Sequence, residues 1–120
     1  MKYLLMIHMN PAVFETLSEA ERTAVVDAHD EFQKRTRESG ELVGFAALAD
    51  PSNTTTVRVR GDVPAVTDGP YLEVKEHLAG FYVVDCETVE RVNELAAMVP
   101  DARFAAVEVR PVMEDAGLEM

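Results

Sequence analysis

Two groups of residues in this sequence have the types and the spacing that proton transfer or ligand binding requires. The first is His29, which lies four residues after Val25 and three before Phe32 and so borders the apolar stripe of a predicted helix. A histidine titrates near neutral pH and can carry a proton to or from a substrate. The alternative is a boundary histidine whose nitrogens are satisfied by Asp30 or by a backbone carbonyl.

The second group begins at Asp68-Gly69-Pro70. An Asx residue before Gly-Pro favours a tight turn in which the Asp68 side chain bonds its own backbone. On a strand, the residues that follow, Tyr71, Glu73 and Lys75, share one face and present a phenol, a carboxylate and an ammonium together. Such a cluster could bind and polarise a small oxygenated ligand, with Asp68 as a second catalytic candidate. It could equally be an exposed ion pair of little energetic consequence.

We expect neither a metal nor a cofactor. The three histidines, His8, His29 and His77, lack the spacing of a metal site. The sequence contains no P-loop, no GxGxxG and no GxSxG motif, so nucleotide-dependent and serine-hydrolase chemistry have no support. The single cysteine, Cys86, excludes an internal disulfide, and its acidic neighbours disfavour the thiolate that a nucleophile would need.

The charge of the chain restricts its partners. There are 22 acidic and 11 basic side chains, giving a formal net charge of −11. Direct binding to nucleic acid draws mainly on cation–phosphate contacts, so we expect none, and anionic membrane surfaces are disfavoured for the same reason. No apolar run is long enough to span a membrane, and the apolar residues 1–7 are too few for a signal peptide. We expect a cytoplasmic protein.

The order of the predicted elements indicates the fold. Strands are predicted over residues 3–7, 42–48, 54–60, 65–67, 78–84 and 104–110, and helices over 18–39 and 87–99. The order is the split βαβ arrangement, an α+β fold with one antiparallel sheet and two helices on one face. The other sheet face then needs a cover. We place the domain at residues 1–112 and an acidic tail at 113–120.

Almost the whole chain resembles a known family, and its central segment carries the most specific motif. The segment 66–76, with Ala79-Gly80-Phe81-Tyr82, is similar to the signature of the DGPF branch of the YCII-related family. That signature reads Asp-Gly-Pro-Phe, an acidic residue, Lys-Glu and Gly-Gly-Phe; this chain departs from it at Tyr71, Val74, His77 and Ala79. The resemblance implies a ferredoxin-like unit that pairs into a dimeric α+β barrel, which agrees with the uncovered sheet face.

The resemblance also bears on the site. YCII-type relatives have a histidine in the first helix that is suspected of acid–base work, and the matching position is His29. Its expected partner is an aspartate near the end of the second helix, where this chain has Pro100-Asp101 in reversed order. Some relatives in the wider superfamily act on small lactones or halogenated ring-cleavage products. DGPF-type genes also tend to lie beside genes for extracytoplasmic-function sigma factors.

Two classes of function follow. The first is a small-molecule enzyme or binding protein with His29 as the acid–base group in a pocket between the first helix and the sheet. The second is a non-catalytic interaction or regulatory module that accompanies a sigma factor and meets it through the acidic surface.

Overall fold

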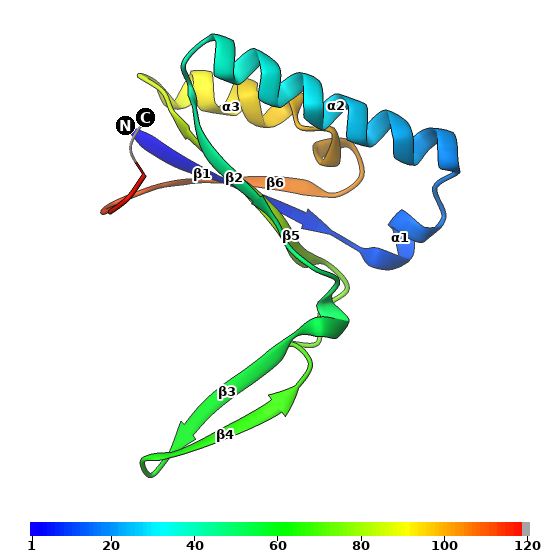
Figure 1. Cartoon of the computed structure of the whole chain (residues 1–120), viewed down its shortest axis with the longest axis vertical. Helices are drawn as coiled ribbons and strands as arrows, with labels where there is room; N and C mark the ends of the chain where they lie inside the picture. Colours follow the sequence, from blue (N-terminus) through cyan, green and yellow to red (C-terminus); the bar gives the residue numbers. More distant parts are fainter. Residues whose placement is uncertain (119–120) are drawn as a thin grey trace.

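A four-stranded antiparallel sheet forms the centre of the molecule, with strand order β2-β5-β1-β6 (Figure 1). The computed structural model describes residues 1–118. Its strands are β1 (Lys2–Met9), β2 (Leu42–Ala47), β3 (Thr55–Arg60), β4 (Val63–Asp68), β5 (His77–Asp85) and β6 (Ala106–Pro111). Its helices are α1 (Pro11–Glu15), α2 (Glu19–Glu38) and α3 (Val89–Met98), with the short 3-10 turns η1 (Pro51–Asn53) and η2 (Pro100–Arg103).

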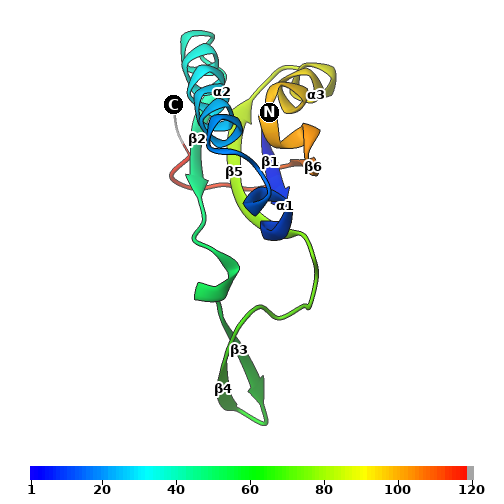
Figure 2. The same ribbon diagram turned by 90° about the vertical axis from the view of Figure 1, so that its right-hand side faces the viewer.

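The two long helices cover one face of this sheet. Figure 2 shows α2 and α3 side by side on the same side of the strands. The predicted α+β, ferredoxin-like arrangement is therefore confirmed. The short helix α1 was not predicted; Pro11 stands in its first turn and the Asn10 side chain accepts a hydrogen bond from the Ala12 amide at its start.

Local signals set the length of α2. The Ser18 hydroxyl accepts a hydrogen bond from the Glu21 amide, and the Glu21 carboxylate accepts one from the Ser18 amide, which confirms the expected capping box. At the other end Gly40 has φ +79°, a conformation that ends a helix and that only glycine adopts without strain. Because both ends are fixed, α2 runs without interruption over Glu19–Glu38 and presents one continuous face to the sheet.

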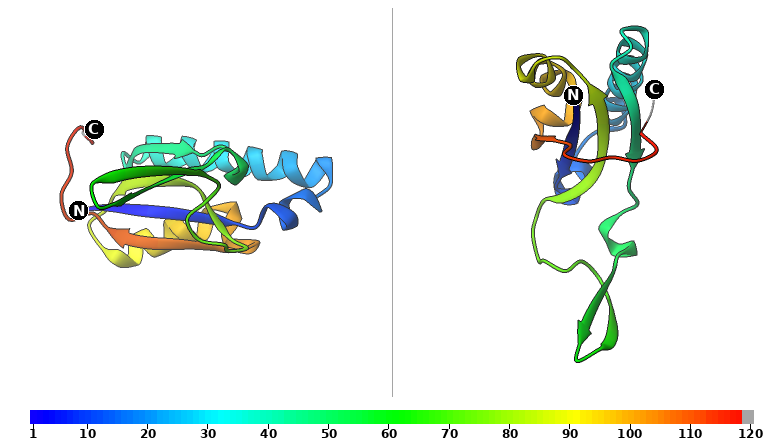
Figure 3. Two further views of the ribbon diagram at one scale, coloured as in Figure 1. Left: turned by 90° about the horizontal axis from the view of Figure 1, so that it is seen from below. Right: turned by 90° about the vertical axis from the view of Figure 1, so that its left-hand side faces the viewer.

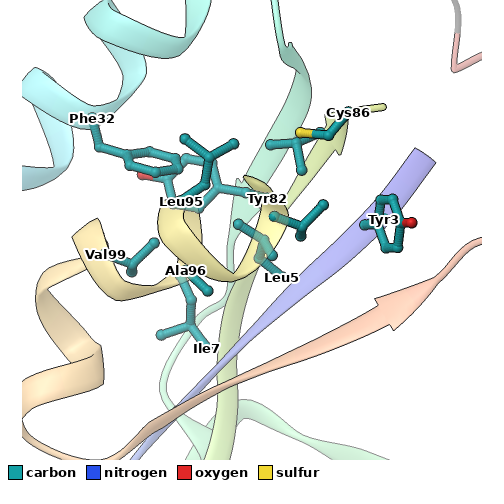
Figure 4. Close-up of a cluster of buried hydrophobic side chains, with 11 residues drawn as sticks. Tyr3, Leu5, Ile7, Phe32, Tyr82, Cys86, Leu95, Ala96 and Val99 are labelled. Atoms are coloured by element: carbon teal, nitrogen blue, oxygen red, sulfur yellow. The ribbon is translucent and has the colours of Figure 1, made fainter. Parts of the chain in front are cut away.

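The hydrophobic core lies between the sheet and the two helices. Alternate residues of β1 point into it, and Figure 4 shows them beneath the inner face of α3. Its buried members are Tyr3, Leu5, Ile7, Phe32, Tyr82, Val84, Cys86, Val92, Leu95, Ala96 and Val99. One member, Tyr82, brings a hydroxyl group into this layer, and that hydroxyl needs a polar partner.

The prediction of a single sheet is wrong. Strands β3 and β4 pair only with each other and form a separate two-stranded arm (Figures 1 and 3). The β2–β5 pairing extends as far as Ala47 opposite Gly80, and beyond it the chain enters η1, where Asp50 accepts a hydrogen bond from the Ser52 amide. The strand that follows therefore pairs with the next stretch of chain, and the predicted short strand 65–67 becomes β4.

The sheet face opposite the helices carries apolar side chains. By strand alternation Leu4, Met6 and Phe81 point away from α2 and α3, and all three are half-buried. The arm lies on this same side of the sheet (Figure 1). Of the predicted tail 113–120, residues 119 and 120 lie outside the described residues; Asp115 pairs with Lys2. Within residues 1–118, no helix combines the length and apolarity needed to cross a membrane.

Candidate functional site: a histidine between an aspartate and a tyrosine

His29 lies in a chain of polar contacts that joins three elements of the fold. Its Nε2 atom is 2.6 Å from Oδ1 of Asp101, and its Nδ1 atom is 2.8 Å from the hydroxyl of Tyr82. The Asp101 side chain is 3% exposed, whereas that of His29 is 23% exposed. Solvent therefore reaches the histidine but hardly reaches the carboxylate behind it.

The chemistry of these groups sets the direction of each hydrogen bond. A carboxylate only accepts, so Nε2–H of His29 donates to Asp101. In the neutral ring Nδ1 is then an acceptor, and the Tyr82 hydroxyl donates to it. The Gln33 amide, 3.1 Å away, donates to the Tyr82 oxygen. Both ring nitrogens of His29 and the Tyr82 hydroxyl thus have partners, and the order of donors selects one tautomer of His29.

Local structure explains why these side chains meet. His29 and Gln33 are four residues apart on α2 and so lie on the same side of the helix as buried Phe32. Tyr82 points from the middle of β5 toward α2, and its ring packs against Phe32 and Phe45, with ring centroids 4.6 and 5.6 Å apart. Burial raises the pKa of the Tyr82 phenol, so it is a proton donor at neutral pH.

Asp101 enters the site from η2, directly after α3. Pro100 follows the last helical segment and starts the 3-10 turn. The backbone amides of Phe104 and Ala105 donate to the carbonyl of Asp101, which fixes the turn and leaves its side chain free for His29. Asp101 is therefore held by its own turn, and His29 is held by a long helix and by Asp101.

A hollow lies between α2 and η2, lined by chain neighbours of His29 and Asp101 but not by these two residues themselves. It has a volume of about 340 Å³ and is lined on one side by Val25 and Ala28 of α2 and on the other by Pro100 and Arg103 of η2. These residues neighbour His29 and Asp101 along their elements. A second hollow of about 560 Å³ lies between α2 and α3, lined by Phe32, Leu95 and Arg91 among others. Neither is a pocket between α2 and the sheet, which is the place that the sequence led us to expect.

The other predicted site residues lie elsewhere. Asp68 is the last residue of β4, on the arm, and it is exposed. Residues 69–76 form no strand, so the shared strand face predicted for Tyr71, Glu73 and Lys75 does not exist, and all three are exposed. Tyr71 instead lies against Arg58, whose guanidinium carbon is 5.6 Å from the centre of the ring. Because the arm is on the sheet side away from α2, this group and His29 are not brought together within one chain (Figures 1 and 2).

Sequence reasoning missed two members of the site. The sequence indicated only that Tyr82 belongs to an apolar strand and that Gln33 occupies a polar position of the helix. The one signal for Gln33 was its distance of four residues from His29. The expected local partner of His29, Asp30, is exposed, and the histidine is satisfied across the fold instead.

A separate polar cluster is formed by Arg91, Glu41 and Cys86. Arg91 donates from Nε and Nη2 to the two oxygens of Glu41, each at 2.9 Å. These bonds hold the pKa of Glu41 at about 2, below its ordinary value of 4.5. Burial, together with the hydrogen bond to Glu41, raises the pKa of the Cys86 thiol to about 11, which argues against a nucleophilic cysteine. Across residues 1–118, no three His, Cys, Asp or Glu side chains are grouped so that they could hold a metal ion.

Comparison with known proteins gives the family. A family model for the YCII-related domain matches residues 1–115. The chain therefore belongs to the YCII-related family. It is also similar to an uncharacterised protein of Rhizobium meliloti (strain 1021), with 29% identity over 114 residues, which covers 93% of this chain and 92% of that protein.

Proposed function

We propose that this YCII-related protein is a small-molecule enzyme or binding protein in which Nδ1 of His29 is the acid–base group. The observation that supports this most is the buried Asp101 carboxylate at 2.6 Å from Nε2. A carboxylate in that position fixes the tautomer and stabilises the imidazolium that forms when Nδ1 takes a proton. A proton-transfer histidine needs both effects.

The role of Tyr82 follows from the same geometry. Its hydrogen bond to Nδ1 is between neutral groups and is weaker than the charge-assisted bond to Asp101. A substrate that carries an acidic C–H or O–H group would therefore replace Tyr82 at Nδ1 and leave the bond between Nε2 and Asp101 in place. Because the raised pKa keeps the phenol protonated, Tyr82 remains a neutral hydrogen-bond donor and does not compete with His29 for the substrate proton. The hollow beside Val25 and Pro100 is the route by which we expect a small ligand to approach.

The test measures proton transfer itself and does not require the complete reaction to be identified. Small lactones and carbonyl acids are incubated with the protein in D2O, and the loss of C–H signal or ring opening is followed by NMR. Asp101→Asn and His29→Gln should slow any catalysed exchange by roughly 100-fold or more. Glu90→Gln, an exposed change on α3, is the control and should leave the rate unchanged. Rates that are equal for all four proteins would contradict an acid–base role of His29.

One observation favours the second class, a non-catalytic interaction or regulatory module. Both ring nitrogens of His29 already have partners within the chain, as a purely structural histidine would. In this case the acidic surface would bind a basic partner such as an extracytoplasmic-function sigma factor. Calorimetry with a purified sigma factor tests it: stoichiometric binding that survives His29→Gln would favour the module over the enzyme.

We further propose that the chain is a homodimer that pairs through the sheet face opposite the helices. The half-buried Leu4, Met6 and Phe81 support this, because a single sheet with helices on one side leaves its other face in need of a cover. The DGPF branch and the cytoplasmic location remain predictions. They rest on the segment 66–76 and on the acidic composition, respectively.

A further inference from the structure

The β3–β4 arm is amphipathic. Residues that face one another across the two strands share a side, and on one side these are Val57 with Val66 and Val59 with Pro64. Val57 is 60% exposed, Val59 58% and Val66 64%. The chain therefore presents a continuous apolar surface, built from both strands, that it does not itself cover.

The opposite side of the arm is polar and partly covered by the chain. Arg58 faces Ala65 across the strands and lies against the ring of Tyr71. Thr56 donates through its hydroxyl to the carbonyl of Gly69, 2.7 Å away. The segment after the arm thus packs on the polar side, and the apolar side is the one without an internal partner.

An arm of this kind needs a second surface to be stable. A two-stranded hairpin alone is marginally stable in water, and it usually gains its stability by packing on another element. The arm also extends the molecule: the radius of gyration is 16.3 Å, whereas a compact domain of this length has about 13.6 Å. In Figure 1 the arm runs away from the helices, on the side of the uncovered sheet face.

We propose that the apolar side of the arm, Val57, Val59, Pro64 and Val66, packs on a second copy of this chain. The inference rests on the proposed homodimer and extends it, because the arm would close over the copy that stacks on the open sheet face. A two-fold axis supplies both contacts at once, since each copy offers an uncovered sheet face and an uncovered arm.

Position favours a second copy over other occupants. The arm lies on the same side of the sheet as the uncovered Leu4, Met6 and Phe81, so a copy that stacks on that face is the surface nearest to the arm. Nucleic acid is disfavoured by the net charge of −11. Anionic membranes, which an apolar arm could also enter, are disfavoured in the same way.

Two adjacent substitutions separate the two sides of the arm. Val66→Asp places a charge on the apolar side, and Ala65→Asp places the same charge one residue away on the polar side; both positions are exposed and both lie in β4. Sedimentation equilibrium of the full chain gives the dimer dissociation constant of each. We expect Val66→Asp to raise it by roughly tenfold or more, and Ala65→Asp to change it by about twofold at most.

Hydrogen exchange of the arm amides gives an independent readout. In the wild type we expect the amides of β3 and β4 to exchange slowly at high protein concentration and to lose protection on dilution. Equal dimer affinity of the two variants would overturn the arm contact while leaving the sheet-face dimer intact. A wild type that sediments only at 13.3 kDa, or an arm protected only when lipid vesicles are added, would overturn it as well. None of these outcomes bears on His29, whose role is tested by proton transfer.

Discussion

Oδ1 of Asp101 lies 2.6 Å from Nε2 of His29, although 72 residues separate them in the chain. The contact ties α2 to the turn after α3, and Tyr82 ties the same histidine to the sheet. His29 is thus the point at which three elements of the fold meet, and its removal has a consequence for stability that is independent of any reaction.

His29→Ala should lower the free energy of unfolding by about 3–5 kcal/mol, because it leaves the buried Asp101 carboxylate without its partner. Urea denaturation measures this directly. Lys34→Ala, an exposed change on the same helix, should cost no more than about 0.5 kcal/mol. A cost near that of the control would mean that Asp101 finds another partner. The size of the loss does not separate a structural histidine from an acid–base one, because Asp101 is buried in both cases.

Glu41 should make the protein sensitive to acid. Its pKa is about 2 in the fold, below the ordinary 4.5, so its stabilising effect is complete above about pH 4.5 and is lost as the pH falls toward 2. Glu41→Gln should remove this part of the pH dependence, on the order of 1 kcal/mol because Arg91 is 40% exposed and solvent screens the pair. Melting curves between these pH values, with exposed Glu90→Gln as control, test it. An unchanged acid slope in Glu41→Gln would contradict the assignment.

Gly80 permits a close approach of β5 to β2. A Cβ atom at this position would lie 2.6 Å from the carbonyl oxygen of Ala46, which is backbone and cannot turn away. Gly80→Ala should therefore destabilise the fold by about 1–3 kcal/mol. Gly44→Ala, also in the β2–β5 ladder, meets nothing within 4 Å and should be tolerated. The prediction fails if both variants melt at the wild-type temperature.

Cys86 should react slowly while the protein is folded. Its pKa of about 11 lies two units above the ordinary 9.0, which reduces the thiolate at about pH 8 roughly a hundredfold, and the side chain is buried as well. Labelling with a thiol reagent should be slow for the native chain and fast in concentrated urea. Rapid labelling of the native protein would show that the thiol is reached by solvent.

The sequence was sufficient for the strands and the two long helices, but not for the short helix α1 or for every pairing. The capping box at Ser18 and Gly40 fixed α2, because these signals are local. The separate arm could not be foreseen, since strand alternation in 54–60 indicates a half-exposed strand but not its neighbour. The choice of partner depends on where η1 directs the chain, which is a property of the fold.

The candidate site, too, could be predicted only in part. His29 could be selected from its type and its place beside the helix stripe. Asp101 could not be assigned, because Pro100-Asp101 reverses the order expected from relatives, and the 3-10 turn that aims its side chain is not visible in the sequence. Tyr82 carried no signal, because a tyrosine within an apolar strand predicts burial and not a hydrogen bond to a histidine 53 residues away.

The most direct test of the Asp101–His29–Tyr82 arrangement is a long-range nitrogen–proton correlation spectrum of the His29 ring. At a pH where the ring is neutral we expect the proton on Nε2 and an unprotonated Nδ1 that accepts from Tyr82, because Asp101 can only accept. Asp101→Asn should redistribute the tautomers, while Glu90→Gln should leave them unchanged. A wild-type ring with its proton on Nδ1, or a spectrum that Asp101→Asn does not alter, would contradict the assignment of Nδ1 as the acid–base atom.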